Sequence, residues 1–275
     1  MTITSKQRAE LRAQAHHLPV AVHIGHQGLT DTVRQTLDDA LRTKELVKVQ
    51  FSKNADVKAK AVANDLAREL NADVVALQEV IGAGPSGVDQ AEAIGAALGM
   101  GWVMHSVRQL RGHNFGNVVL SRYPISNHGH YELTWRTCEE RACQRADVDL
   151  GHGAALHIYN VHLGTAVLER RYQAGRLAAF VHDHRVKGPK VILGDFNEWM
   201  KGLATKTLSS LFKSIDIAEH LKRKRTYPGI FPVLHLDHIY YEGDVTVRGM
   251  ELVRTRKSLI ASDHLPLVAD FRIGV

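Results

Sequence analysis

Asp195 and Asn197 form the first pair of residues in this sequence that could do chemistry. Residues 191–193 are a short apolar run of the kind that is buried in a sheet, and Gly-Asp-Phe-Asn follows directly at 194–197. Because side chains alternate along a strand, a carboxylate and an amide two residues apart reach the same side of its end. The tetrapeptide alone is equally typical of a strand that ends in an Asx turn.

Further polar side chains lie at the ends of other predicted strands. Glu79 ends the apolar strand predicted for residues 73–80, and His162 ends another strand. Asp263 and His264 follow a polar loop near the C-terminus. Each residue alone is also compatible with a solvated side chain after a buried strand. Their shared position at strand ends indicates one site, because a rigid scaffold with an open tip is a usual place for chemistry.

Taken in their order along the chain, these stretches resemble the motifs of the endonuclease/exonuclease/phosphatase superfamily, the deoxyribonuclease-I-like phosphodiesterases. Residues 120–125 and 236–239 fit intermediate motifs of the same family. The resemblance extends over roughly residues 72–273, and six short motifs in the family's order are far more specific than one. It implies an α/β fold, a four-layered sandwich in which two mixed sheets pack face to face between helices.

The resemblance implies that these side chains hydrolyse a phosphodiester bond. Glu79 would bind Mg²⁺, with Mn²⁺ as the alternative ion, and Asp263 offers a second metal ligand. Asp195 would orient or deprotonate the attacking water. Asn197 would donate hydrogen bonds to the phosphate without adding charge.

Two histidines and their neighbours complete the implied site. The resemblance implies that His264 contacts the scissile phosphate and that His162 helps to protonate the leaving group. Asp237 would orient one of these imidazoles, although a turn aspartate is also common at such a position. Arg122 matches a family position near the substrate phosphates. Asn117 lies close to it in sequence and is a candidate for the lining of the site.

The sequence departs from the family pattern at the opening strand. In the family, this strand ends in an asparagine that helps to hold metal or phosphate. Asn54, which follows the predicted strand of residues 47–51, is the candidate for that metal-binding position, and Ser52 is a weaker one. We therefore expect a hydrolase domain that is truncated at its N-terminus.

A separate pattern occupies the first part of the chain. The predicted order there is helix, strand, Gly-x-x-Gly loop, helix, strand, helix, strand, and the loop consists of Gly25, His26, Gln27 and Gly28. Two glycines let the backbone approach a phosphate, and the start of the next helix offers free N–H groups. Such loops clamp single-stranded RNA, although a plain strand-to-helix turn has the same sequence.

Together with residues 5–8 and 45–49, this loop resembles the CRM domain (chloroplast RNA splicing and ribosome maturation) of the small bacterial YhbY type. The resemblance implies binding of RNA, in particular ribosomal or pre-ribosomal RNA. We expect a CRM-like module in residues 1–72 and the hydrolase domain in residues 73–275, with a boundary shared within residues 47–80.

The composition sets wide limits. The chain has 275 residues, of which 44% are hydrophobic and 23% charged, so a mainly disordered protein is excluded. A formal net charge of +6 suits a polyanionic partner without specifying one. The first residues contain no apolar segment, and no stretch approaches the length of a transmembrane helix. A cytoplasmic protein with no membrane partner is expected.

Some residues outside these motifs could also meet a nucleic acid. The basic run at 222–225 could follow a phosphate backbone, although a solvated loop is equally typical. Trp135, Trp199 and Tyr227 could stack on bases, but core or rim packing is the more common role of such side chains.

Three functional hypotheses follow. The first is an RNA-binding protein whose second domain hydrolyses phosphodiester bonds in nucleic acid with Mg²⁺. The second is a non-catalytic RNA-binding or ribosome-assembly factor with a degenerate hydrolase domain. The third is a phosphatase or phosphodiesterase that acts on a small or lipid phosphoester.

Overall fold

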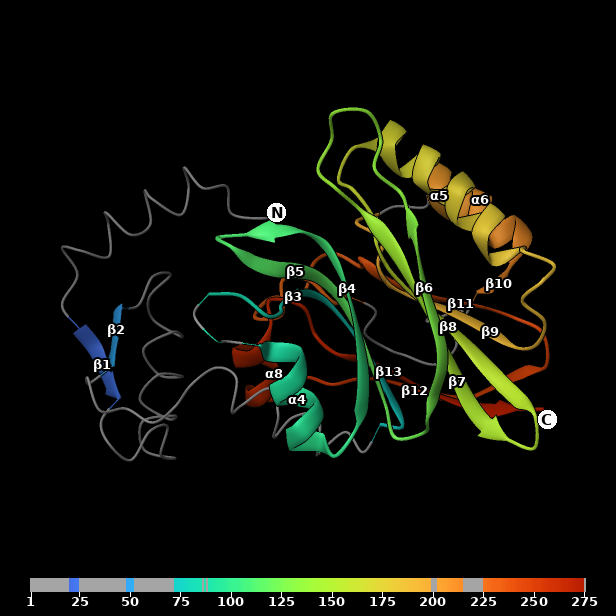
Figure 1. Cartoon of the computed structure of the whole chain (residues 1–275). Helices are drawn as coiled ribbons and strands as arrows, with labels where there is room; N and C mark the ends of the chain where they lie inside the picture. Colours follow the sequence, from blue (N-terminus) through green and yellow to red (C-terminus); the bar gives the residue numbers. More distant parts are fainter. Residues whose placement is uncertain are drawn as a thin grey trace. The chain divides into compact units, whose positions relative to one another are not determined.

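The computed structural model describes residues 20–24, 48–51, 72–85, 87, 89–198, 202–214 and 225–274, and the chain divides into two compact units, 1–62 and 63–275. In the first unit, strands β1 (Val20–Ile24) and β2 (Lys48–Phe51) pair in parallel (Figure 1). Parallel pairing needs a crossover connection. The helix that the sequence predicts between these strands lies outside the described residues. The Gly25–Gly28 loop and Asn54 lie outside the described residues.

The largest sheet of the second unit has six strands in the order β10-β11-β9-β8-β7-β6. These strands are β6 (Ile125–Glu132), β7 (Ala142–Gly151), β8 (Ala154–His162), β9 (Lys190–Asp195), β10 (Lys213–Ser214) and β11 (Asp237–Glu242). Only β8 and β9 are parallel neighbours, and helix α5 (Val167–Val181) connects them. Helices α5 and α6 (Leu203–Leu211) cover the outer face of the sheet (Figure 1).

Two smaller sheets pack on the inner face of the large one. The first has the order β3-β5-β4, with β3 (Val74–Ile81), β4 (Gly101–Leu110) and β5 (His113–Ser121). The second pairs β12 (Val245–Leu252) with β13 (Leu267–Ile273). Helix α8 (Arg256–Ala261) lies between these two strands in the chain. Aliphatic side chains from all three sheets form the core between the layers.

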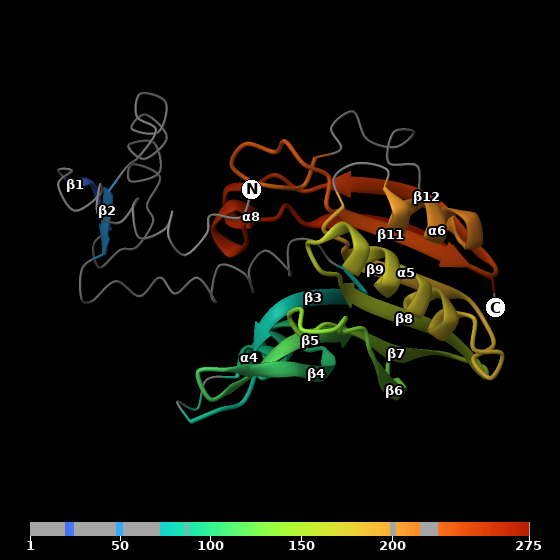
Figure 2. The same ribbon diagram turned by 90° about the horizontal axis from the view of Figure 1, so that it is seen from above.

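Strand β5 shows how alternation builds the layers. Val119 faces the large sheet, whereas its neighbours Val118 and Leu120 face helix α4 (Gln90–Leu98) on the other side. The order is therefore helix α4, the small sheets, the six-stranded sheet, and helices α5 and α6 (Figure 2). This four-layered α/β sandwich confirms the predicted fold class. Among the described residues, no helix combines the length and apolarity that crossing a membrane requires.

Several buried amides connect the facing sheets, and that of Asn160 makes three of these contacts. The Asn160 Nδ2 atom, on β8, donates to the carbonyl oxygens of Leu77 at 2.9 Å and Val118 at 3.0 Å. Its Oδ1 atom accepts from the Gln78 Nε2 atom at 2.6 Å. The register of β3 and β5 shifts between Leu77 and Val80, so this amide fixes the irregular end of β3 that carries Glu79.

We predict that Asn160→Asp lowers the free energy of unfolding by about 3 kcal/mol, because the ionised carboxylate offers no donor to two buried carbonyl groups. Urea unfolding checks this prediction. The same change at Asn127, which is exposed on β6, is the matched control. A loss within about 0.5 kcal/mol of that control would contradict the role assigned to Asn160.

Candidate active site

Three neighbouring strands bring His162, Asp195 and Asp237 to one edge of the six-stranded sheet. Parallel strands β8 and β9 both end there, and antiparallel β11 begins there. In the register, Asp195 lies opposite His162 on one side and opposite Asp237 on the other. The side chains therefore converge because of strand pairing, although they are far apart in sequence.

Gly194 allows this pairing to continue up to Asp195. Its φ angle is +140°, and a Cβ atom there would lie 2.0 Å from the carbonyl oxygen of Val161 on β8. No other residue type fits without moving one strand.

Asn197 holds the turn that follows. Its φ angle is 51°, its backbone N–H donates to the Asp195 Oδ1 atom at 2.8 Å, and its Nδ2 atom donates to the Leu163 carbonyl oxygen at 2.8 Å. One amide hydrogen bond is thus used by the protein itself. An amide NH₂ group has two donors, so a second one remains for a phosphate.

The Asp195 Oδ2 atom lies between two imidazoles. The His162 Nε2 atom is 3.6 Å from it, and the His264 Nε2 atom is 3.9 Å from it. The His264 Nδ1 atom is bound to the Asp237 Oδ2 atom at 2.9 Å, which fixes the orientation of that ring. The ring of Tyr227 packs on His264 with 4.8 Å between the centroids.

Burial and neighbouring charges move the pKa values of these groups in different directions. Burial, and then the charge of Asp237, raise the pKa of Asp195 to about 7. Although burial opposes it, the hydrogen bond and charge of Asp237 raise the pKa of His264 to about 9. Burial and the nearby Arg141 lower the pKa of His162 to about 3. At neutral pH, His264 therefore carries a proton, His162 is neutral, and Asp195 is poised to exchange one.

A cleft beside this cluster is lined by Glu79, Asn117, Arg141 and His162, among others. Glu79 is exposed and has a φ angle of 59° at the irregular end of β3. Positive φ is uncommon for a residue other than glycine, and such strained positions are frequent at functional sites. Asn117 is buried and donates through its Nδ2 atom to the Ala142 carbonyl oxygen at 3.2 Å.

Arg141 lines this cleft, although no sequence pattern pointed to it. Its side chain is buried, and one Nη atom is 2.9 Å from the Glu139 carboxylate. Its Nε atom is buried without a hydrogen-bond partner among the described residues, which is costly unless a ligand supplies an acceptor. The available signal was its position directly before strand β7, whose start lies at the sheet edge where the antiparallel strand β8 ends in His162.

The structure does not bring Arg122 into this group. Its backbone N–H donates to the Asp73 carbonyl oxygen, and one Nη atom lies 3.7 Å from the Asp73 carboxylate. Because β5 runs antiparallel to β3, the residue after β5 lies beside the start of β3. Glu79 lies six residues further along β3, a distance of about 20 Å.

Asp263 lies next to His264 in sequence and is exposed. Its backbone carbonyl accepts from the Gly229 N–H at 2.8 Å, and its charge contributes to the raised pKa of His264. It therefore acts on the site electrostatically whether or not it is also a ligand.

Within the described part of the chain, no group of three or more His, Cys, Asp and Glu side chains is arranged to hold a metal ion. Glu79 and Glu140 are the carboxylates of the cleft. Mg²⁺ typically takes one or two protein carboxylates, several waters and the oxygens of a substrate phosphate. The donor set fits an ion that is shared with the substrate, and it does not fit a closed protein site.

Two families match this chain. Residues 3–81 match the CRS1/YhbY (CRM) domain, and residues 49–264 match the endonuclease/exonuclease/phosphatase family. The protein YbhP of Escherichia coli strain K12 is 31% identical over 225 residues, which are 76% of this chain and 87% of YbhP. YqeI of Bacillus subtilis, a probable RNA-binding protein, is 32% identical over 73 residues, which are 26% of this chain and 76% of YqeI.

Solved structures agree with the second match. The endonuclease/exonuclease/phosphatase from Bacteroides vulgatus superposes with a TM-score of 0.65 at 18% identity, covering 78% of this chain and 90% of that one. The chain therefore belongs to the endonuclease/exonuclease/phosphatase family and carries a CRS1/YhbY (CRM) domain at its N-terminus.

Proposed function

We propose that the second domain hydrolyses phosphodiester bonds in nucleic acid with a divalent metal ion, in the first place Mg²⁺, and that the CRM domain binds RNA and makes RNA the substrate. The observation that carries the proposal is the Asp195 carboxylate, held between a protonated and a neutral imidazole. Family membership supports a phosphoester hydrolase, and the description of YqeI supports RNA binding.

We also infer that the domain boundary lies between β2 and β3, close to residue 72. The two family matches overlap over residues 49–81. Within that overlap, β2 pairs with β1, whereas β3 pairs with β5. This pairing supports a CRM-like module in residues 1–72 and a hydrolase domain in residues 73–275.

Asp195 is the general base of this proposal. A carboxyl group with a pKa near the working pH combines a useful fraction of the ionised form with enough basicity to take a proton from water. The Asn197 backbone N–H binds its Oδ1 atom, so the Oδ2 atom remains for the water.

Positive charge in the site would stabilise the phosphate during the reaction. His264 is protonated at neutral pH and can donate from its Nε2 atom, since Asp237 occupies the Nδ1 atom. The Nε atom of Arg141 can donate to a phosphate oxygen. Glu79 would hold the metal ion, which supplies further positive charge to the phosphate oxygens when bound.

His162 is the proposed donor to the leaving oxygen. Because the pKa of His162 is lowered, its imidazole is neutral in the site without substrate. The substrate therefore meets a neutral imidazole when it binds. A phosphate between His162 and Arg141 would raise the pKa of this imidazole, because an adjacent negative charge favours the protonated form. Proton donation would then depend on the presence of the substrate.

The first test is the cleavage of labelled single-stranded RNA, duplex DNA and bis(p-nitrophenyl) phosphate by the full chain with Mg²⁺ or Mn²⁺. Single-stranded RNA should be cleaved, EDTA should abolish cleavage, and Asp195→Asn should reduce the rate by about 10²-fold or more because the base is lost. Asp270 is exposed on β13, so Asp270→Asn makes the same chemical change away from the site and serves as the control.

Three outcomes would contradict the proposal. A folded chain that binds RNA but cleaves none of these substrates would be the non-catalytic RNA-binding factor. Hydrolysis confined to small or lipid phosphoesters would indicate the third hypothesis. Equal loss of activity in Asp270→Asn and Asp195→Asn would mean that the effect of the substitution is not specific to the site.

A second prediction concerns the partner of His264. Asp237→Asn should lower the pKa of His264 from about 9 toward its usual value of 6.5, because both the hydrogen bond to a carboxylate and the negative charge are lost. Histidine titration by NMR measures this shift directly. A His264 pKa that is unchanged in the variant would refute the assignment.

The same raised pKa predicts a pH dependence of stability. The imidazolium form of His264 contributes fully below pH 6.5, and its contribution is lost as pH rises to about 9. The parent protein should therefore lose stability relative to Asp237→Asn across this window, as measured by urea unfolding at several pH values. A constant difference across the window would contradict the prediction.

A further inference from the structure

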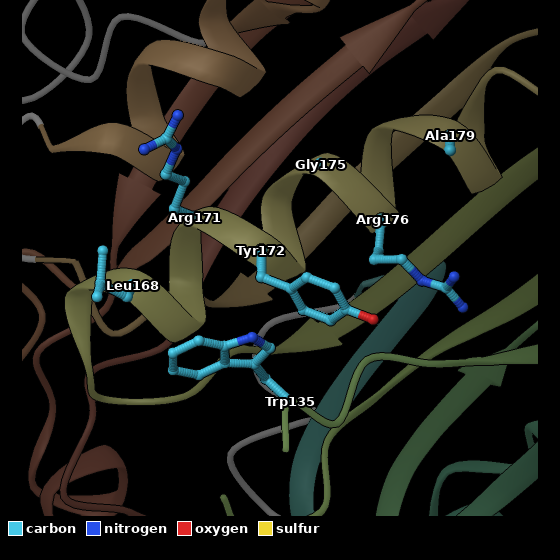
Figure 3. Close-up of a pocket in the computed structure, with 7 residues that line it drawn as sticks. All are labelled: Trp135, Leu168, Arg171, Tyr172, Gly175, Arg176 and Ala179. Atoms are coloured by element: carbon cyan, nitrogen blue, oxygen red, sulfur yellow. The ribbon is translucent and has the colours of Figure 1, made fainter.

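An open groove of about 500 Å³ runs along the outer surface of helix α5. Trp135, from the connection between β6 and β7, forms one side (Figure 3). The groove is otherwise lined by helix residues, which include Leu168, Arg171, Tyr172, Gly175 and Arg176. Figure 3 shows the ring of Trp135 beside that of Tyr172, with Leu168 toward one end and Arg176 toward the other.

Leu168 and Tyr172 of this groove are exposed on α5, away from the residues that the helix buries. Helix α5 packs inward through Ala174 and Leu177, which are fully buried. On its outer face, Leu168 is 60% exposed and Tyr172 is 40% exposed. The rings of Trp135 and Tyr172 are tilted by 33°, with 6.5 Å between their centroids. They therefore offer ring surface to a ligand from outside.

The charge around these rings is positive. The Arg136 guanidinium lies 4.7 Å from the centre of the Trp135 ring, and Arg171 and Arg176 line the groove. None of the lining residues carries a carboxylate. Exposed aromatic rings among arginines are the combination that binds single-stranded nucleic acid, because bases stack on the rings while the phosphates meet the positive charge.

Gly175 keeps the floor of the groove open. It lies inside α5, where glycine costs about 1 kcal/mol relative to alanine. A Cβ atom at this position would have no neighbour within 4 Å, so packing within the described protein does not require glycine. Close approach of a ligand to the helix would account for it.

The groove and the catalytic cleft share their supporting segments. Four residues separate His162, at the end of β8, from the start of α5. Trp135 lies on the connection that also carries Arg141 of the cleft. Among the groove residues of α5, Leu168 is therefore the one closest in sequence to His162 of the cleft. Ala179 lies about 17 Å further along the helix.

We propose that this groove binds a single-stranded segment of the nucleic-acid substrate, whose bases stack against Trp135 and Tyr172 while a neighbouring phosphate occupies the cleft. The proposal rests on the phosphodiesterase function proposed above. It adds that the enzyme selects unpaired strands, because bases in a duplex already stack on each other and are not free to stack on the rings.

The test measures binding at this groove separately from binding at the CRM domain, because Trp135 is made the only tryptophan of the chain and its fluorescence is followed. The full chain carries Trp102→Phe, Trp199→Phe and the non-cleaving Asp195→Asn, and oligouridylate is titrated into it. The oligonucleotide should quench Trp135 fluorescence, whereas an abasic oligomer of equal length should not. Gly175→Leu should raise the apparent Kd about 10-fold, since stacking is worth about 1–3 kcal/mol per base.

Ser210→Leu adds the same side chain to the exposed surface of α6 and is the matched control, with folding of both variants checked by circular dichroism. The proposal is overturned if oligouridylate does not quench Trp135, or if the abasic oligomer quenches it equally. Quenching by an acidic peptide but not by RNA would overturn it in favour of a protein partner.

Parallel cleavage assays on the chain with native Asp195 separate failure of this proposal from failure of the proposed function. Cleavage of RNA without quenching of Trp135 fluorescence would overturn the proposal for the groove and leave the proposed phosphodiesterase function intact. Quenching without cleavage of any substrate overturns the phosphodiesterase function, and with it the role of the groove in holding a substrate.

Discussion

The candidate site depends on buried amide hydrogen bonds between two facing sheets, and Asn160 makes three of them. Asn160 lies on β8, two residues before His162, and it binds backbone and side-chain atoms of β3 and β5 in the facing sheet. The cluster around Asp195 belongs to the six-stranded sheet, whereas Glu79 belongs to the three-stranded one. Without a directional contact between them, two apolar faces could slide, because hydrophobic burial does not specify register. The Asn160 amide fixes the carboxylate of one sheet relative to the histidine of the other.

Electrostatic asymmetry gives the site its proposed division of roles. Burial and the charge of Asp237 disfavour ionisation of Asp195, and the His264 imidazole lies between the two carboxylates and holds a proton there. On the other side of Asp195, burial and then the charge of Arg141 lower the pKa of His162 and keep it neutral. Two imidazoles near the same carboxylate thus have opposite protonation states at neutral pH. This difference allows His264 to stabilise the negative charge of the phosphate from the start. It allows His162 to take up a proton when the substrate binds.

Two families meet in one short part of this chain. The matches overlap over residues 49–81, yet the described strands in that segment belong to different units: β2 to the pair with β1, and β3 to the hydrolase sandwich. In the described part of the second unit, β3 is the first strand. The phosphodiesterase chemistry proposed for this chain therefore depends on residues from β3 onward, together with any contribution from Asn54.

The sequence by itself determined the fold class and pointed to several residues that the structure brings together in the candidate site. Apolar runs that end in polar residues correctly predicted where strands β3, β8 and β9 end, and the side chains of Glu79, His162 and Asp195 lie at those ends because strand length follows from local hydrophobicity. Only the tertiary structure decided which strand ends share an edge. Antiparallel pairing moved Arg122 away from the site, and the buried Arg141 joined it.

The linking role of Asn160 and the protonation states were likewise decided by the tertiary structure. Asn160 binds Leu77, which lies 83 residues earlier in the chain, and no local pattern reports such a contact. The pKa values of Asp195, His162 and His264 depend on burial and on charges brought close by other strands. Local sequence specifies where a strand stops, whereas register and desolvation arise only when distant segments pack together.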